Sequence, residues 1–466
     1  MSSSLVTEQI IQITYLVASV LFILSLKWLS SPATARRGVR AGELGMALAI
    51  GGTLLYHGII DYRWVVIALV VGAIVGIPLG LVPMTAVPQR TALSHAFGAF
   101  SVTLVGAAEF YLRAPNISRF MMSVLSMEVI LGSLTFTGSL MAAGKLQEYL
   151  PQRPITFKGQ NIVNLSILAM AVGLAGYLVL HPEQTSLFPL LILLPLIFGV
   201  MMIVPIGGAD MPTVISLLNS YAGLSAAAMG FALNSKLLII AGALDGSSGF
   251  ILSVIMSKAM NRSFTNVLFG AFGQVQTAAV AEHETRNVRT ATAEEAAGIL
   301  GAANSVVIVP GYGLAVAQAQ HKVRELYEVL TKRGVAVKFG IHPVAGRMPG
   351  HMNVLLAEAD IPYDKLLDMD AINPEFPETD VVLVIGANDV TNPAARNDQG
   401  SPIYGMPILD VDKARTVMVI KRGMSPGFAG IDNPLYYLDK TLMLFGDARG
   451  FVGDIVKELG SASGRG

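Results

Sequence analysis

One stretch of the sequence passes from an apolar run into two closely spaced glycines: Ser305-Val306-Val307-Ile308-Val309-Pro310-Gly311-Tyr312-Gly313-Leu314-Ala315. The run over 305–309 predicts a short buried strand, and the two glycines allow a sharp turn into a helix that we expect over 314–333. Free N–H groups at the start of such a helix attract an anion, so a pyrophosphate would fit there. A tight strand–helix turn also uses glycine when no ligand is present, and this pattern alone does not separate the two interpretations.

The residues around this stretch alternate between short apolar runs and amphipathic segments. We expect further strands over 335–339, Val381–Ile385, 416–420 and 442–444, and helices over 352–359 and 450–459. Thr292, with Glu295 three residues later, predicts a capped helix start ahead of the first strand. Strands that alternate with helices predict a parallel sheet covered on both faces, here a Rossmann-like α/β domain over 290–466. A ligand of such a sheet would lie at the carboxyl ends of the strands.

Composition separates this domain from the first part of the chain. The 466 residues are 53% hydrophobic and only 14% charged, which is too apolar for a soluble protein of this size. About nine apolar windows over 1–262 are long enough to cross a bilayer and predict an α-helical polytopic membrane domain. The windows are 10–26, 44–60, 64–82, 92–111, 120–143, 162–180, 187–204, 211–233 and 237–256, of which 44–60 is short and rich in glycine. Residues 263–289 show no sustained period and predict a linker.

The chain has no cysteine and a formal net charge of zero. Without cysteine, disulfides and thiolate–metal sites are excluded, and no other metal-ligand spacing stands out. A neutral chain gives no reason to expect nucleic acid as a partner. Basic residues over 27–40 and 144–160 predict cytoplasmic loops, which places the N-terminus outside and the C-terminal domain in the cytosol. No positive residue precedes the first apolar window, so we expect no cleaved signal peptide.

Four ionisable residues in or directly beside the predicted spans need an explanation: His95, Glu128, Asp210 and Asp245. Charge in hydrocarbon is costly, and a proton path would explain these residues, with Asn219 as a polar partner that does not titrate. His95 is the best candidate to take up and release a proton, since histidine titrates near neutral pH. The alternatives are hydrogen bonding between helices for His95 and Glu128, and helix capping for Asp210. Asp245 needs a partner that the sequence does not name.

Three further clusters lie at or just after the carboxyl ends of predicted strands: Gly386-Ala387-Asn388-Asp389-Val390, Lys421-Arg422-Gly423 and Gly427-Phe428-Ala429-Gly430. An NAD site usually has an acidic residue about twenty positions after the glycine turn, but here the second strand leads into Gly340-Ile341-His342. NAD is therefore disfavoured. Arg347, Lys421 and Arg422 could instead pair with the 2′-phosphate of NADP, although Lys421 and Arg422 could also form only a solvated strand end.

Longer motifs occur in both parts of the chain. In the α/β domain they are Pro310-Gly311-Tyr312-Gly313, the run 340–359, the run 384–389 and Lys421-Arg422, and in the membrane part they are 208–212, 218–221 and 259–263. With these motifs the chain resembles, over nearly its whole length, the β subunit of proton-translocating NAD(P) transhydrogenase. The agreement extends over too many residues to arise by chance.

The resemblance implies a membrane domain that conducts protons and a cytosolic domain that binds NADP(H), in a direction inverted relative to most dinucleotide folds. It also implies a separate α subunit, of one chain or two, that holds NAD(H), and a dimer of αβ units. The complex would be embedded in the lipid of a bacterial inner membrane as a multi-pass protein. Hydride would pass directly from NADH to NADP⁺, driven by protons that move from the outside to the cytosol.

By motif, the resemblance also implies roles for individual residues. The NADP(H) site would comprise Gly311, Tyr312, Gly313, Val344, Ala345, Gly346, Arg347, Met348, Pro349, Gly386, Ala387, Asn388, Asp389, Val390, Gly405, Met406, Lys421, Arg422, Gly423, Met424, Ser425, Pro426, Gly427, Phe428, Asp447 and Ala448. Lys421 and Arg422 would meet the 2′-phosphate. His95 and Asn219 would lie on the proton path, with Glu128 and Asp210 as further candidates, and Asp389 would couple the nucleotide state to protonation.

Two positions depart from the family pattern. Gly423 stands where the family often has serine, which removes one side-chain hydrogen bond to the phosphate, and Asp245 stands where the family often has an apolar residue. We hypothesise that Asp245 contributes to the proton path or pairs with a polar group on a neighbouring span. Two other functions compete with this one. A transporter or channel that senses NADP(H) is disfavoured by the extent of the match, and a membrane-anchored dehydrogenase acting alone lacks an acid or base near the nucleotide.

Overall fold

The computed structural model describes residues 2–55, 61–83, 86–151, 154–207, 210–260, 287–348, 350–401, 403–427 and 429–462. The chain forms two compact units. The first comprises Met1–Val82, Gln89–Ile206 and Val214–Ser253, and the second comprises Pro83–Pro88, Gly207–Thr213 and Val254–Gly466. The predicted boundary at 262 and the predicted linker, except for its last three residues, lie outside the described residues.

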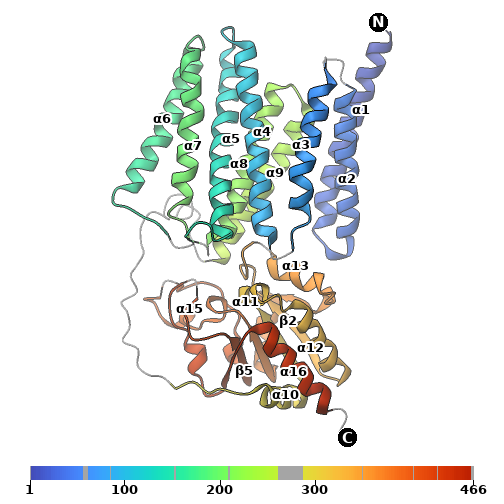
Figure 1. The fold of residues 1–466 in the computed structure, drawn as a ribbon, viewed down its shortest axis with the longest axis vertical. Helices are drawn as coiled ribbons and strands as arrows, with labels where there is room; N and C mark the ends of the chain where they lie inside the picture. The colour runs from blue at the N-terminus through green and yellow to red at the C-terminus, as the bar shows by residue number, and fades with distance from the viewer. Residues whose placement is uncertain are drawn as a thin grey trace. The chain divides into compact units, whose positions relative to one another are not determined.

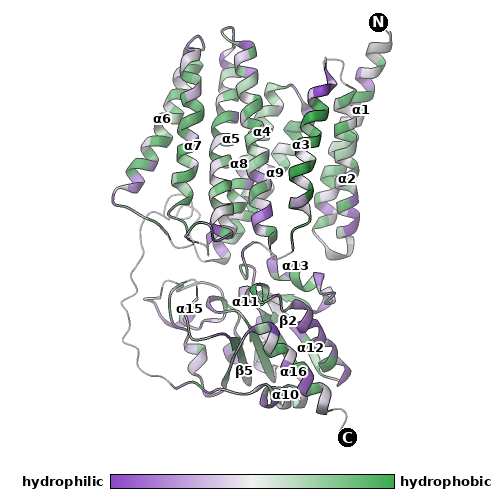
Figure 2. Cartoon of the chain, in the orientation of Figure 1, coloured by the Kyte–Doolittle hydropathy of each residue, from purple (hydrophilic) through white to green (hydrophobic). Residues whose placement is uncertain are grey.

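The described residues up to 260 contain nine long helices (Figure 1). They are α1 (Ser2–Leu29), α2 (Pro32–Leu54), α3 (Tyr62–Gly80), α4 (Val87–Arg113), α5 (Arg119–Leu146), α6 (Gln160–Leu180), α7 (Phe188–Ile203), α8 (Met211–Ala232) and α9 (Lys236–Ala259). Among the described residues, eight of these helices, all except α2, are long and apolar enough to cross a membrane. Figure 2 shows hydrophobic residues dominating along them. The chain is thus a multi-pass membrane protein, in line with about nine predicted spans.

The start of α2 corrects the first predicted loop. The basic residues expected in a loop over 27–40 lie mostly on α2, because α1 ends at Leu29 and α2 begins at Pro32. Proline is tolerated in the first helical turn, where its missing N–H would have no partner. The span predicted over 44–60 is accordingly the second half of a longer helix that ends at Leu54. The charged first half of α2 explains why α2 is too polar to count as a candidate span.

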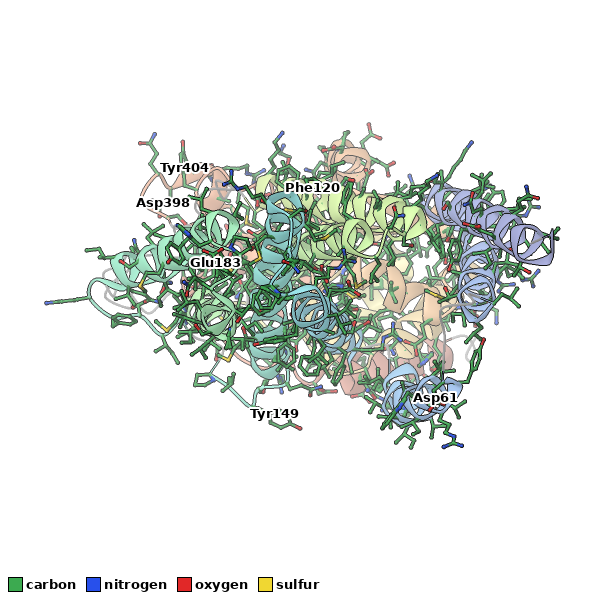
Figure 3. The ribbon with its side chains drawn as sticks, turned by 90° about the horizontal axis from the view of Figure 1, so that it is seen from above. Asp61, Phe120, Tyr149, Glu183, Asp398 and Tyr404 are labelled. Atoms are coloured by element: carbon green, nitrogen blue, oxygen red, sulfur yellow. The ribbon has the colours of Figure 1, made fainter. Side chains whose placement is uncertain are left out.

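α3 stands at the edge of the helical unit. None of its residues is buried. Figure 3, seen from above, shows Asp61 at the start of α3, well apart from Phe120 on α5 and from Glu183 between α6 and α7. The Asp61 carboxylate accepts a hydrogen bond from Arg63 N at 2.9 Å and so caps the helix. α3 is therefore held by its cap and its connections more than by burial within this chain.

Six parallel strands form one sheet in the second unit, in the order β3-β2-β1-β4-β5-β6. They are β1 (Ser305–Pro310), β2 (Ala336–Ile341), β3 (Leu366–Asp368), β4 (Val381–Ile385), β5 (Thr416–Lys421) and β6 (Thr441–Phe445). The five strands expected from the apolar runs are confirmed to within two residues. β3 was missed, because three partly exposed residues at the edge of the sheet carry no apolar run.

Helices cover both faces of this sheet, as predicted. Successive β1 residues point to opposite faces, so Ile308 joins one core and Val307 the other. The first core is closed by α10 (Ala293–Ala302), α12 (Gln320–Lys332), α13 (His351–Glu358) and α16 (Ala448–Ala462), and the second by α14 (Met369–Ile372), α15 (Ala394–Asn397) and the turns around them. α10 begins with the predicted capping box, in which the Glu295 carboxylate accepts from Thr292 N at 2.8 Å.

The helix predicted over 314–333 is divided in two. α11 covers Tyr312–Val316, and α12 begins at Gln320. Between them Gln318 has a φ of 49°, with Gln318 N donating to Ala315 O and Ala319 N donating to Leu314 O, each at 3.1 Å. This pair of bonds is the Schellman ending of a helix, which requires a residue in the left-handed region. The glycine turn therefore leads into a single short helical turn before the main helix.

Candidate functional site

The hydrogen bonds of the sheet continue beyond the carboxyl ends of its central strands. Gly311 N, just after β1, donates to Ile385 O at 2.9 Å, and Gly386 N, just after β4, donates to Ile420 O at 3.3 Å. The turns that follow β1, β4 and β5 therefore lie side by side. We call this edge of the sheet, with the turns that follow its strands, the carboxyl edge. It carries the clusters over 311–313, 386–390 and 421–423 that the sequence singled out.

The glycines after β1 and β4 pack against each other. A Cβ atom at Gly313 would lie 2.7 Å from Gly386 Cα, and a Cβ atom at Gly311 would overlap the backbone of Ala387. Gly386 also has a φ of 68°, which favours glycine. α11, which follows the first two glycines, has only five residues. The packing of the two turns accounts for these glycines, so they do not by themselves indicate a pyrophosphate.

His342, at the end of β2, holds two of the predicted segments together. Its Nδ1 accepts a hydrogen bond from Val344 N at 3.2 Å, so its Nε2 carries the proton and donates to Pro407 O at 2.8 Å. Burial lowers the pKa of His342 to about 4, and the bond to the Pro407 carbonyl opposes this shift. A neutral histidine therefore joins the segment over 344–348 to Gly405 and Met406.

Arg347 lies next to Tyr312, which follows β1. Its guanidinium carbon lies 4.2 Å from the centre of the Tyr312 ring, and the arginine is buried. Such a contact between a cation and a ring is stabilising when it is shielded from water. The Arg347 backbone N donates to His351 Nδ1 at 3.1 Å, and burial, aided by the Arg347 charge, lowers the pKa of His351 to about 4. The turns after β1 and β2 thus form one packed wall at the carboxyl edge.

A second wall forms around Asn388, in the turn after β4. The Asn388 side-chain oxygen accepts from Tyr436 Oη at 2.8 Å and from Asn433 Nδ2 at 3.1 Å. Asn392 Nδ2 donates to Asp432 O at 3.0 Å. Burial raises the pKa of Tyr436, which keeps its hydroxyl protonated and able to donate. These bonds tie the turn after β4 to the segment over 432–436.

Lys421 and Arg422 lie where β5 meets its following turn. Lys421 Nζ donates to Ser425 O and lies 5.5 Å from the centre of the Tyr436 ring. Burial lowers the pKa of Lys421, and the charges of Asp432 and Asp389 oppose this shift. Arg422 is exposed and has no hydrogen bond or ion pair within the described part of the chain. Lys421 is thus half-buried and held, whereas the Arg422 guanidinium is available to an anion.

Asp389 holds the loop that follows Lys421 and Arg422. Its carboxylate accepts a hydrogen bond from Ala429 N at 2.9 Å. A Cβ atom at Gly427 would lie 2.8 Å from the Asp389 carboxyl carbon, so the loop approaches this carboxylate where glycine leaves room. The position of the loop over 425–430 is therefore coupled to the side chain of Asp389.

The other predicted binding residues lie around the same edge. Asp447 caps the start of α16 by accepting from Arg449 N at 3.0 Å, and Gly405 N donates to Ala395 O at 2.8 Å. Those that are buried are Ala345, Ala387, Val390, Met406 and Ala448, and those that are partly buried are Val344, Gly346, Met348, Gly423 and Met424. Ser425 and Pro426 are exposed. Pro349 and Phe428 lie outside the described residues.

The structure separates one cation from the other two. β1 and β4 lie between β2 and β5, so at about 4.8 Å per strand the ends of β2 and β5 are about 14 Å apart. Arg347 follows β2, whereas Lys421 and Arg422 belong to the end of β5. That all three pair with one 2′-phosphate stays a prediction. Lys421 and Arg422 remain together, and Arg347 belongs to the other wall.

Several residues of this edge were not identified from the sequence. Asn433, Tyr436 and Pro407 bond to groups 45 to 65 positions away in the chain. Nothing in their local sequence indicates those partners. Asn433 and Tyr436 follow closely after the glycine-rich loop 427–430, which is the one signal that could have drawn attention to them.

The predicted proton-path residues lie on or directly before helices of the first part of the chain. His95 on α4 has a buried Nδ1 with no partner among the described residues. Glu128 on α5 is fully buried, and its carboxyl group packs against Gly106 of α4. Asp210 lies just before α8, where its N donates to Gly207 O at 3.2 Å. Asn219 on α8 donates to Asp245 on α9 at 3.2 Å, so the partner that the sequence did not name for Asp245 is Asn219.

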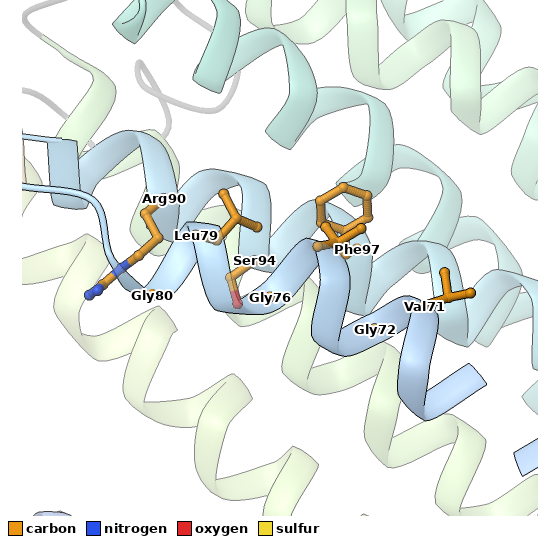
Figure 4. Close-up of a pocket in the computed structure, with 9 residues that line it drawn as sticks. Val71, Gly72, Gly76, Leu79, Gly80, Arg90, Ser94 and Phe97 are labelled. Atoms are coloured by element: carbon orange, nitrogen blue, oxygen red, sulfur yellow. The ribbon is translucent and has the colours of Figure 1, made fainter. Parts of the chain in front are cut away.

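A cavity of about 580 Å³ lies between α3 and α4 (Figure 4). Its walls are mostly apolar, with the glycines of α3 on one side and Phe97 of α4 on the other, and Arg90 lies near Gly80 at one end. None of the predicted site residues lines this cavity. It therefore does not belong to either candidate site described above.

Known proteins resemble the chain over nearly its whole length. A model of the family described as NAD(P) transhydrogenase beta subunit matches residues 11–458. The NAD(P) transhydrogenase subunit beta of Rhodospirillum rubrum is 48% identical over 463 residues, which cover 97% of this chain and 100% of the relative. A second sequence of that name from the same organism gives the same values. With membrane helices, a six-stranded parallel sheet and this degree of identity, the chain belongs to the family of NAD(P) transhydrogenase beta subunits.

Proposed function

We propose that the carboxyl edge binds NADP(H) and that the helical part conducts protons inward, so that proton flow drives hydride transfer from NADH to NADP⁺. The observation that carries the nucleotide assignment is the pair Lys421 and Arg422 at the end of β5. Arg422 is exposed and has no partner among the described residues, and its planar fork matches a phosphate. β2 ends in the buried neutral His342, which offers no acid to ribose hydroxyls.

The positions of these groups favour an inverted nucleotide. In the usual fold with this strand order, the adenosine ribose lies at the end of β2. Here the phosphate-binding cations are on the opposite half of the sheet, at β5. The adenosine end would therefore lie over β5 and the nicotinamide end over β1 and β2. Tyr312 and the segment over 344–348 would then flank the nicotinamide.

The protein groups would bind and position the nucleotide. When bound, the nicotinamide itself would accept or give the hydride, and the chain would supply orientation and shelter from water. Asn388 and Tyr436 would fix the wall against which the nucleotide rests. Asp389 would hold the loop over 425–430, and a change in its charge would release that loop. These roles make Asp389 a positioning residue that couples loop position to protonation.

The membrane part would carry the protons. His95 on α4, Glu128 on α5, Asp210 before α8 and Asn219 on α8 supply polar groups within the helical part. Polar groups at that depth are costly and are retained where ions or protons pass. The two nicotinamides differ little in reduction potential. A proton gradient can therefore drive the reaction only if protonation changes nucleotide affinity, and the nucleotide must then change proton affinity equally.

Membership of the family as a β subunit implies an α subunit as partner. We propose that this partner holds NAD(H), in one chain or two, and that the complex is a dimer of αβ units. The basic residues on α2 and after α5 support a cytosolic C-terminal domain and an N-terminus outside a bacterial inner membrane. The extent of the match does not favour a transporter that only senses NADP(H).

Calorimetric titration of the full chain in detergent, with NADPH and separately with NADH, tests the nucleotide assignment. NADPH should bind and NADH should bind far more weakly. Arg422→Ala should weaken NADPH binding about thirtyfold, since a hydrogen bond to a charged group contributes about 2 kcal/mol. Arg415→Ala, at the opposite end of β5, is the matched control and should leave NADPH affinity unchanged. Equal affinity of the wild type for the two nucleotides would exclude the assignment.

A further inference from the structure

α8 and α9 lie very close together where they cross, because glycines at the crossing leave room for the facing backbone. A Cβ atom at Gly249 would lie 2.7 Å from Ser220 N, and a Cβ atom at Gly230 would lie 2.6 Å from Ile239 N. Ser220 Oγ also donates to Gly246 O at 2.8 Å. Small residues let membrane helices approach this closely, and the hydrogen bond fixes their register. Side chains beside the crossing are therefore held at a constant separation.

The crossing joins an amide to a carboxyl group. Asn219 Nδ2 donates to Asp245 Oδ1 at 3.2 Å, and a Cβ atom at Gly249 would lie 2.9 Å from that amide nitrogen. The missing side chain at position 249 therefore leaves the room that the Asn219 amide occupies. Any larger residue there would displace the amide from Asp245.

Asp245 faces no charged group on either helix of the crossing. α8 contains no Asp, Glu, His, Lys or Arg, and Tyr221 is its one titratable residue. On α9 the charged neighbours are Lys236 and Lys258 near its ends, about 14 Å and about 20 Å away along the axis at 1.5 Å per residue. Ser248 and Ser247 donate their hydroxyls to the carbonyls of α9 itself. Asn219 is thus the described side chain that bonds to the Asp245 carboxyl.

The Asp245 side chain lies on the exposed surface of the helical unit. An ionised carboxylate with one amide donor is costly at membrane depth, whereas a protonated carboxyl group is far less so. The environment therefore places two protonation states of Asp245 in competition. A group in that situation can gain and lose a proton as its surroundings change.

The hydrogen bond to Asn219 fits both states. The amide N–H donates to Oδ1 whether the carboxyl group is ionised or neutral, because the carbonyl oxygen of the neutral acid also accepts. Oδ2 has no partner among the described residues. A hydronium ion can therefore transfer its proton to Oδ2, forming an O–H bond and leaving water, and the reverse step returns the proton to water. Asn219 holds the carboxyl group while its charge changes.

We propose that Asp245 is a proton-exchanging group of the translocation path and that Asn219 is the residue that positions it. This inference rests on the proposed function, because it places the exchange within inward proton conduction. The path of this chain would then have a titrating group at the α8–α9 crossing, beside an asparagine that cannot titrate.

The test uses the full chain assembled with its α subunit in liposomes. Hydride transfer to NADP⁺ and proton uptake, the latter by an internal pH-sensitive dye, are measured together between pH 5.5 and 9. Asp245→Asn keeps the size and can still accept from Asn219, but it cannot exchange a proton. We expect proton-driven turnover to fall about a hundredfold, the lower range for a lost proton-transfer group, with loss of one limb of the pH profile. Ser248→Ala, whose hydroxyl bonds only to backbone, should behave as wild type.

Two further measurements separate the possible outcomes. Asp245→Glu should restore a pH-dependent limb at a shifted position, and both variants should still bind NADPH. A wild-type rate and pH profile in Asp245→Asn would overturn the inference, and so would an equal loss at every pH that Asp245→Glu does not recover. If the wild type itself takes up no protons in these liposomes, the proposed function fails instead.

Discussion

The two halves of the carboxyl edge use their polar groups in opposite ways. On the β1–β2 half, His342, His351 and Arg347 are buried and bonded to one another's segments or to Tyr312. On the β5 half, Lys421 is half-buried and Arg422 is exposed without a partner among the described residues. The cation of the first half, Arg347, packs against Tyr312, although His351 Nε2 is buried without a partner among the described residues, whereas the second half leaves the Arg422 guanidinium exposed. At the carboxyl edge, a charged side chain without a partner is a better indication of a phosphate site than one that is already paired.

This contrast separates stability from nucleotide choice. Changes on the β1–β2 half should cost stability, because they break bonds that exist without a nucleotide. Changes on the β5 half should alter nucleotide affinity with little effect on stability. Each of the following experiments compares the two halves directly.

Acid should loosen the β1–β2 half first. His342 and His351 are neutral in the folded chain, with pKa values lowered from 6.5 to about 4. Between pH 6.5 and pH 4 the unfolded chain binds more protons than the folded chain. The free energy of unfolding is therefore highest above pH 6.5 and decreases as the pH falls towards 4. The shift corresponds to about 3 kcal/mol for each histidine. Hydrogen exchange of full-length protein, corrected for intrinsic rates, should show lower protection over 343–352 at pH 5 than at pH 7. Equal protection there at both pH values would contradict the account.

Removing one charge from the β5 half should affect nucleotide binding. Lys421→Met keeps the apolar stem of the side chain and deletes the ammonium group. We expect NADPH affinity to fall about thirtyfold, corresponding to about 2 kcal/mol, with unchanged hydrogen-exchange protection over 343–352. Lys338→Met on β2, whose ammonium pairs with Glu375 in an exposed ion pair at 2.6 Å, is the control and should bind NADPH as the wild type does. A similar loss in both variants would remove the distinction between the halves.

The smallest expected effect is a gain. A Cβ atom at Gly423 would meet nothing within 4 Å, so Gly423→Ser introduces a hydroxyl without a steric clash. Beside Lys421 and Arg422, this hydroxyl should donate to the bound phosphate and raise NADPH affinity about fivefold, corresponding to about 1 kcal/mol. Gly460→Ser on α16 also meets nothing within 4 Å and should change nothing. A loss of affinity in Gly423→Ser would indicate that the phosphate approaches the backbone too closely for a side chain.

The sequence predicted those features that depend on neighbouring residues. The apolar run over Val381–Ile385 became β4 with the same bounds, and Thr292 with Glu295 formed the expected cap. The clusters after β1, β4 and β5 could be expected to converge, because parallel strands end at one edge. These predictions succeeded because burial and capping act over a few positions in the chain.

The sequence could not predict features that depend on distant residues or on backbone angles. The division between α11 and α12 depends on a positive φ at Gln318, a residue type that does not mark such a turn. The bond from His342 to Pro407 spans 65 positions, and that from Asn219 to Asp245 joins two helices. Arg347 was grouped with Lys421 and Arg422 because all three carry positive charge. The strand order, which the sequence does not reveal, places β1 and β4 between the strands that these residues follow.

The interlocked turns at Gly311, Gly313 and Gly386 limit how this sequence can change over evolutionary time. The space that a side chain would need at each glycine is filled by the backbone of the facing turn, not by another side chain. A second substitution that shortens a neighbouring side chain therefore cannot compensate for the first. Relatives should keep these three glycines even where the choice of nucleotide has drifted. Conservation of these glycines would then reflect the packing of the sheet. Whether a relative binds the same nucleotide must be judged from the residues after β5.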